Sequence, residues 1–272
     1  MSATLVLAIL VASLVAAHEA PAATEELPLW ELGIGTFPSS YPAYRGSHHQ
    51  KFFVLPLPYV VYRGDFLKID RKGMRARLFE SDRVELNISI NGGVPAKSNS
   101  GSAREGMPNL HGVLEIGPAI DVLVAMPSPQ ETIKIRLPVR SAIDTNFQFA
   151  GWIFNPQLEF DYEGGRGGWS GSLSFGPEFA TRKYHAYYYE VAPAFATAER
   201  PAYRASAGYS GANAIASVSR HFAHFWVGGF LRYDYLGGAA FDDSPLLETQ
   251  HSLMGGIGVA WVFATSAKTV SR

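Results

Sequence analysis

The segment from Ser252 to Phe263 alternates, with a period of two, between bulky apolar residues and mostly small ones. One side of an extended chain would carry Leu253, Ile257, Val259, Trp261 and Phe263. The other side would carry Ser252, Gly256, Gly258 and Ala260, with Met254 and Val262 as apolar exceptions. Because successive side chains of a strand point to opposite faces, this pattern predicts a strand with one oily face. We interpret that face as one that contacts lipid.

The same alternation recurs with polar residues where the core of a water-soluble protein would need apolar ones. It is clearest in residues 84–91, 133–140 and 154–163. The charged positions of the last two segments form a candidate lumen: Lys134, Arg136, Arg140, Glu159, Asp161 and Glu163. Both signs of charge are present, as expected of a barrel interior that is filled with water or with ion pairs.

Composition narrows the ways in which such a chain could cross a membrane. It has 272 residues, of which 47% are hydrophobic and only 17% charged. Beyond its N-terminal segment it has no run of about 18 apolar residues, so spanning helices are excluded. A closed β-barrel is then the remaining membrane-spanning structure, because lipid cannot satisfy open backbone edges. The net charge of -1 gives no electrostatic argument for nucleic acid.

The chain divides into three parts on sequence grounds. An apolar run from Leu5 to Val15 is followed by small residues, and we interpret residues 1–23 as a signal peptide cleaved between about residues 17 and 23. Residues 24–263 are expected to form the barrel, and residues 264–272 a C-terminal tail. Trp261 and Phe263 would supply the insertion signal for the barrel-assembly machinery.

Clusters of Gly, Pro, Asn and Asp cut the chain into about twelve candidate strands, and an even number is expected. The segments are residues 30–37, 52–62, 65–70, 74–80, 83–92, 113–126, 132–142, 152–163, 169–181, 184–195, 203–219 with 222–236, and 252–263. Residues 95–109 and 242–249 are predicted to be long loops, which in outer-membrane barrels lie opposite the short periplasmic turns. The predicted fold is therefore an all-β, transmembrane antiparallel outer-membrane β-barrel of ten to twelve strands.

Short motifs that combine charged residues with Gly, Pro and aromatic residues are spread along this barrel segment. They are Tyr44-Arg45-Gly46-Ser47, Pro56-Leu57-Pro58-Tyr59, Tyr62-Arg63-Gly64-Asp65-Phe66, Leu78-Phe79-Glu80-Ser81, Ala103-Arg104-Glu105-Gly106-Met107-Pro108 and Leu114-Glu115-Ile116-Gly117-Pro118. Together they resemble the MipA/OmpV family, and the resemblance covers about residues 29–263. It implies a scaffold in the outer membrane that links a murein-degrading lytic transglycosylase to a bifunctional penicillin-binding protein. It supplies no catalytic residues.

The charged residues of these motifs admit two interpretations. Arg with a carboxylate at a strand end commonly makes a bidentate pair that fixes a turn or holds the wall, and this is the interpretation we favour. Recruitment of a partner protein is the alternative. The residues concerned are Arg45, Arg63, Asp65, Glu80, Arg104 and Glu105.

Sites for metals, cofactors and catalysis are not predicted. His48 and His49 are neighbours, and His221 and His224 are three apart, so neither pair shares a face of a strand. His251 and Ser252 are likewise adjacent, which excludes joint action on one face of a strand. The rival function is a passive channel for small polar solutes, and a third possibility is a soluble all-β carrier.

Overall fold

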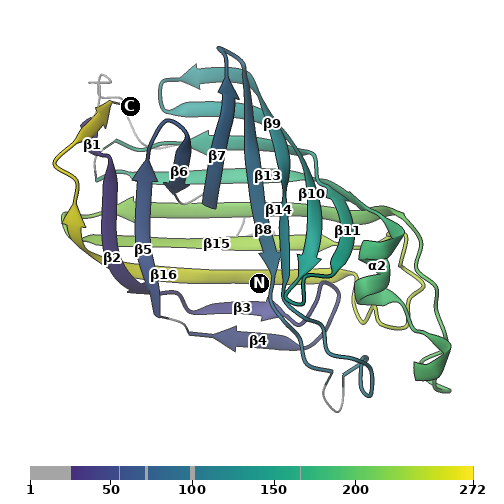
Figure 1. Cartoon of the computed structure of the whole chain (residues 1–272). Helices are drawn as coiled ribbons and strands as arrows, with labels where there is room; N and C mark the ends of the chain where they lie inside the picture. The colour runs from purple at the N-terminus through teal and green to yellow at the C-terminus, as the bar shows by residue number, and fades with distance from the viewer. Residues whose placement is uncertain (1–25, 55, 71–72, 99–101, 166, 272) are drawn as a thin grey trace, which may run out of the picture.

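The computed structural model describes residues 26–54, 56–70, 73–98, 102–165 and 167–271. The predicted signal peptide lies outside these residues. The strands are β1 (Glu26–Pro28), β2 (Trp30–Thr36), β3 (Ser39–Pro42), β4 (Gln50–Phe53), β5 (Pro56–Arg63), β6 (Leu67–Asp70), β7 (Gly73–Glu80), β8 (Val84–Gly93), β9 (Val113–Ser128), β10 (Glu131–Asp144), β11 (Phe149–Phe154), β12 (Gln157–Tyr162), β13 (Trp169–Ala180), β14 (Gly208–His221), β15 (Phe225–Tyr235), β16 (His251–Thr265) and β17 (Thr269–Ser271). Helix α2 (Arg182–Tyr189) and a 3-10 helix (Pro193–Phe195) lie between β13 and β14 (Figure 1).

Antiparallel pairing joins the strands into a closed ring. From β5 to β10, each strand pairs with the next one along the chain. Strands β13, β14, β15 and β16 follow in the same way, and the ring closes where β16 pairs with β2 and β2 pairs with β5. Strands β11 and β12 share one place in the ring, because both lie between β10 and β13. Counted in this way, the ring formed by the described residues has twelve strands. The predicted antiparallel barrel of outer-membrane type is confirmed.

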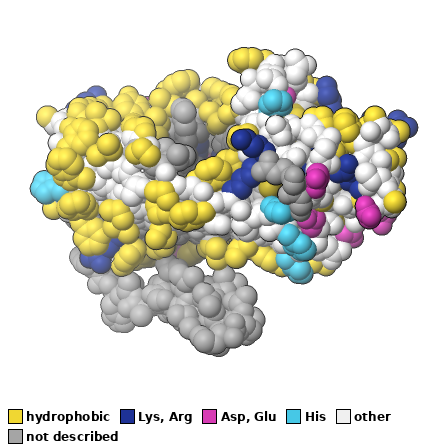
Figure 2. Space-filling model, turned by 90° about the horizontal axis from the view of Figure 1, so that it is seen from below, with side chains coloured by type: hydrophobic (Ala, Val, Ile, Leu, Met, Phe, Trp, Pro, Cys, Tyr) yellow, Lys and Arg dark blue, Asp and Glu magenta, His cyan; other side chains and the backbone are white. Residues whose placement is uncertain are grey.

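The barrel is apolar outside and polar inside. Ile257, on the predicted oily face of β16, is 69% exposed, whereas Asn87 on the polar face of β8 is fully buried. Asp121 and Asp161 are also buried. In Figure 2 hydrophobic side chains gather over the left part of the visible face, and His, acidic and basic side chains over the right. The alternation in the sequence therefore places apolar residues on the lipid-facing side and polar residues in the lumen. This is the opposite of the burial pattern in a soluble protein.

The two ends of the barrel differ in the length of their connections. At one end, here named the turn end, the connections are short: residues 64–66, 81–83, 129–130, 163–168 and 222–224. The opposite end, here named the loop end, carries the long connections 94–112, 181–207 and 236–250. Strands β1 and β17 pair at the turn end, on the left of Figure 1, and α2 lies at the loop end on the right. The predicted asymmetry of loops and turns, including the loops at 95–109 and 242–249, is confirmed.

The prediction of a strand over residues 184–195 is wrong. Residues 182–189 form α2 instead, and Tyr184, His185 and Tyr189 are its buried side chains. Aromatic residues are common in strands, but here they recur at helical spacing, and the rings of Tyr184 and Tyr188 pack 5.2 Å apart. Burial of these rings against the loop end outweighs their strand propensity.

Other boundaries also differ from the prediction. The single strand expected over residues 152–163 breaks between Phe154 and Gln157, where Pro156 has no N–H to continue the ladder. The strand expected from residue 203 begins only at Gly208. Strands β3 and β4 form a hairpin that the sequence did not predict, and β3 pairs with β16 beyond the end of β2.

One joint of the ring is short. Among the described residues, β5 pairs with β6 only at Tyr62 with Ile69 and at Arg63 with Lys68, whereas its pairing with β2 runs from Pro56 to Tyr62. Pro56 and Pro58 lie in the part of β5 beyond this joint, and the absence of an N–H on proline suits a strand edge.

The outward face of β16 gives a direct test of lipid contact. Replacing Ile257, near the middle of the strand, with Lys should destabilise the folded barrel by about 2–4 kcal/mol, because the charge would lie in hydrocarbon. The matched change of Leu253, on the same face near the strand end, should cost about 0–1 kcal/mol. Reversible unfolding in phospholipid vesicles measures both. Equal effects of the two changes would contradict the assigned membrane contact.

Candidate functional site

The family-motif residues lie in two separate places. Tyr44, Arg45 and Gly46 belong to the connection between β3 and β4, and Arg104 to Pro108 belong to the loop 94–112, so both groups are at the loop end. Tyr62, Arg63, Gly64, Asp65, Phe79 and Glu80 lie at the turn end, and Pro56 and Pro58 lie in the wall. The motifs therefore do not form one site.

The connections at the loop end pack together into a cap. Its buried cluster contains Tyr44, Leu110, Tyr189, Leu236 and Phe241, and Leu236 and Phe241 are completely buried. The rings of Tyr189 and Phe241 stack with centroids 3.7 Å apart. Residues from four connections thus make a small hydrophobic core over the barrel, and this cap covers the loop end of the lumen.

The motif from Arg104 to Pro108 fastens its loop to the cap. The Arg104 guanidinium donates to the carbonyl oxygens of Tyr188, at 2.8 Å, and Pro108, at 3.3 Å. Arg200 donates to the carbonyl oxygen of Glu105 at 2.7 Å. Met107 is buried beside residues of two other connections. These contacts favour the structural interpretation of this motif over partner recruitment.

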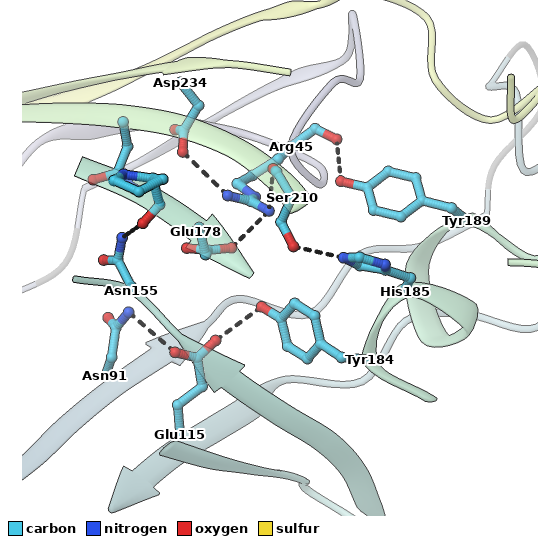
Figure 3. A network of polar contacts seen from close by, with 12 residues as sticks. Arg45, Asn91, Glu115, Asn155, Glu178, Tyr184, His185, Tyr189, Ser210 and Asp234 are labelled. Carbon is cyan, nitrogen blue, oxygen red and sulfur yellow. Dashed lines mark hydrogen bonds and ion pairs between the residues drawn. The ribbon is translucent and has the colours of Figure 1, made fainter. Parts of the chain in front are cut away.

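Arg45 lies at the centre of a buried ionic network beneath the cap (Figure 3). Its guanidinium is 2.7 Å from the Glu178 carboxylate and 3.4 Å from that of Asp234. Arg232 is 2.7 Å from the same Asp234 carboxylate. Burial lowers the pKa of Arg45, but Glu178, Tyr189 and Asp234 together outweigh it and hold that pKa well above its ordinary value. Arg45 therefore stays charged and ties the β3–β4 connection to the inner wall.

The neighbouring Gly46 has a backbone conformation that favours glycine and little space for a side chain. Its φ is 85°, in the left-handed region, and an added Cβ would lie 2.3 Å from Leu247 Cδ1. The glycine of this motif is thus required chiefly by its left-handed backbone conformation.

The candidate lumen residues lie on inward faces or at the turn end. Arg140 is 3.1 Å from Glu115, which also accepts a hydrogen bond from the Tyr184 hydroxyl at 2.9 Å. Arg136 is 3.6 Å from Asp121. Lys134 pairs in register with Glu159, and Asp161 is buried two residues further along β12. Glu163 borders a cavity at the turn end.

Helix α2 contributes a buried histidine to the same region. His185 Nδ1 is 2.6 Å from the Ser206 carbonyl oxygen, and its Nε2 is 2.6 Å from the Ser210 hydroxyl. Burial lowers the pKa of His185, and the nearby Arg45 acts in the same direction. The neutral ring therefore donates from Nδ1 to the carbonyl and accepts from Ser210 at Nε2.

The turn end contains a cavity of about 1040 Å³, and a smaller one of about 350 Å³ lies beneath the cap, lined by Arg45, Glu178 and Arg232 among others. Arg63 contacts Glu31 there at 2.5 Å, and Glu31 is 3.3 Å from His221 Nε2. The Tyr59 hydroxyl is 2.6 Å from the same nitrogen. Arg77, on the cavity wall, forms ion pairs with Glu80 and with Glu85.

Several residues of the cap network were not predicted as site residues: Glu178, Tyr189, Arg232 and Asp234. Three of them are charged, and they occupy inward positions of β13 and β15, so their alternation with apolar residues was the available signal. Within the described part of the chain, no group of three or more His, Asp or Glu residues could hold a metal ion. No helix of that part is long and apolar enough to span a membrane.

The family comparison agrees with the motif analysis. The family described as MltA-interacting protein MipA matches residues 32–263. The chain belongs to the MipA family. No curated protein matched this MipA-family chain.

Solved structures similar to the MipA-family chain include three outer-membrane proteins. An outer membrane channel from Pseudomonas putida F1 has 12% identity and a TM-score of 0.41, with 90% of this chain and 100% of that chain covered. The outer membrane protein OprG from Pseudomonas aeruginosa has 8% identity and a TM-score of 0.25, covering 89% and 99%. The Pseudomonas putida toluene transporter TodX has 10% identity and a TM-score of 0.27, covering 93% and 70%.

Removing Arg45 should strongly destabilise the barrel. The change Arg45→Leu leaves the buried carboxylates of Glu178 and Asp234 with less compensation, and we expect a loss of about 3–5 kcal/mol. Arg182→Ala breaks the more exposed pair with Glu190 and a hydrogen bond to the Ala205 carbonyl oxygen, and should cost about 1–2 kcal/mol. Urea unfolding of the detergent-solubilised protein measures both losses. A loss at Arg45 no larger than that at Arg182 would refute the role of the network.

His185 should make stability depend on pH. Its ordinary pKa is 6.5 and its folded pKa is lower, so below pH 6.5 the unfolded chain binds a proton that the folded barrel does not. Stability should therefore fall as the pH decreases from 6.5 to the folded pKa, and level off below it. Urea midpoints measured across this range should drop less in His185→Gln. An unchanged pH profile in that variant would count against this assignment.

Proposed function

We propose that this MipA-family outer-membrane barrel is a non-enzymatic scaffold. Its partners are peptidoglycan-remodelling enzymes, a lytic transglycosylase and a penicillin-binding protein, which dock at the turn end. That end faces the periplasm in this proposal, because short turns are periplasmic in outer-membrane barrels. An N-terminal signal peptide exports the chain, and the barrel-assembly machinery inserts it.

The main support for the proposal is that one end of the barrel is covered and the other is open. The loop end is covered by a cap with its own buried core, and beneath it the paired charges of Arg45 and Glu178 line a cavity of about 350 Å³. The turn end keeps a cavity of about 1040 Å³ and exposed charged turns. A barrel with one covered end suits the docking of a partner protein at its open end better than the passage of solutes through both ends.

The family supports the identity of the partner. Its name describes a protein that interacts with MltA, and the resemblance noted in the motifs implies a link between a lytic transglycosylase and a penicillin-binding protein. Asp65 and Asp82 lie in neighbouring turns at the turn end and are exposed, so they are accessible to a periplasmic protein.

A passive channel is the second candidate. The cavity and the charged residues on the inward faces of β10 and β12 favour it. The pairing of Arg136 with Asp121 and of Arg140 with Glu115 opposes it, because paired side chains occupy the lumen.

Binding and conductance measurements separate the two functions. The purified barrel should capture a purified lytic transglycosylase, and the double change Asp65→Lys with Asp82→Lys should weaken capture by about tenfold through charge repulsion. The matched double change at the loop end, Glu199→Lys with Asp243→Lys, should leave capture unaltered. The wild-type barrel should show no steady current in planar bilayers.

Two results would contradict the scaffold. One is a steady current through the wild-type barrel together with no capture of either enzyme. The other is capture that is lost through the loop-end changes and kept in the turn-end variant, since the docking end would then be the opposite one.

A further inference from the structure

Three neighbouring strands place basic residues in one row. In the antiparallel register Arg63 of β5 lies opposite Lys68 of β6, and Lys68 lies opposite Arg75 of β7. Arg77 follows two residues later on β7, and therefore shares the face of Arg75. Like charges directly opposite each other destabilise a sheet. A row of this kind needs compensation from neighbouring acidic groups or from a ligand.

The acids near this row compensate its ends but not its middle. Arg63 is paired with Glu31, and Arg77 is paired with Glu80 and Glu85. Lys68, between them, makes no ion pair or hydrogen bond with a side chain or carbonyl of the described residues. The charges of Glu85 and Glu80 act on its ammonium, but both carboxylates are already in ion pairs with Arg77, so among the described residues Lys68 has no ion pair of its own.

The row faces an accessible space. Arg63, Lys68 and Arg77 all line the turn-end cavity of about 1040 Å³. Tyr59 and Trp226 line it too, with ring centroids 5.6 Å apart. The cavity lies inside the ring of strands, so its occupant would be a water-soluble molecule that enters at the turn end.

The carboxylates that line the same cavity do not neutralise Lys68. Glu31 contacts Arg63 and His221, and so its charge is already shared. Asp65 lies in the turn 64–66 and Glu163 opens the turn 163–168, which puts both at the mouth of the cavity. The interior wall formed by β5, β6 and β7 is therefore positive, behind a mouth that carries acids.

We propose that this cavity binds a small soluble anion with two or more carboxylate or phosphate groups. Lys68 is the central contact, and Arg63 and Arg77 flank it with N–H groups suited to planar oxyanions. Binding relieves the repulsion along the row. This ligand site is independent of the scaffold function, since it needs neither enzyme.

Calorimetric titration of the full, detergent-solubilised barrel tests the site with two probes, citrate and inorganic pyrophosphate. At least one should bind, and its affinity should fall with rising salt. Lys68→Gln should weaken binding by about tenfold or more, the scale of one charge-assisted hydrogen bond. Lys68→Arg, which keeps the charge, should restore most of the affinity. The matched control is Lys134→Gln, an inward lysine outside this cavity, which should bind as the wild type does.

The outcomes identify the class of ligand, and two of them would overturn the proposed site. Preference for citrate identifies a carboxylate ligand, and preference for pyrophosphate a phosphate ligand. No heat from either probe with the wild type overturns the proposal. So does equal weakening by Lys68→Gln and Lys134→Gln, which would indicate only a general effect of lumen charge. Heat-modifiable migration on gels confirms that each variant is folded.

Discussion

Closure of the backbone hydrogen-bond network is the constraint on which the rest of this structure depends. Hydrocarbon offers no partner for an N–H or a carbonyl group, so the sheet must join its own edges. It does so where β16 pairs with both β15 and β2. Once the ring is closed, its outer face meets lipid and must be apolar, which leaves the inner face for polar residues. The inverted burial of Ile257 and Asn87 follows from this.

Charges inside a ring of this size need partners, because removing a lone charge from water costs several kcal/mol. The barrel meets this need differently at its two ends. At the loop end Arg45 brings a connection down onto Glu178 and Asp234, and the aromatic cap closes over them. At the turn end the basic row from Arg63 to Arg75 is only partly compensated. The first arrangement holds the cap on the barrel, and the second leaves Lys68 without an ion pair among the described residues.

The alternation of side chains was sufficient to predict the barrel and the faces of β10 and β16, because period-two patterning follows from strand geometry itself. It failed at α2, since Tyr184 and Tyr188 suit a strand or a helix, and the packing of the cap decides between them. The cap network could not be predicted either. Arg45 and Asp234 are 189 positions apart, and a local pattern does not specify which distant carboxylate a motif arginine meets.

The two-pair joint between β5 and β6 has a mechanical consequence for the ring. The strands that bring the two ends of the chain together, β2 and β16, are bonded over a longer stretch than this joint. Thermal fluctuations of a sheet concentrate where the fewest backbone bonds must break. The most easily opened joint of the barrel is therefore the one between β5 and β6, beside Lys68. Any widening of the ring there would change the spacing of the basic row before it disturbed the cap.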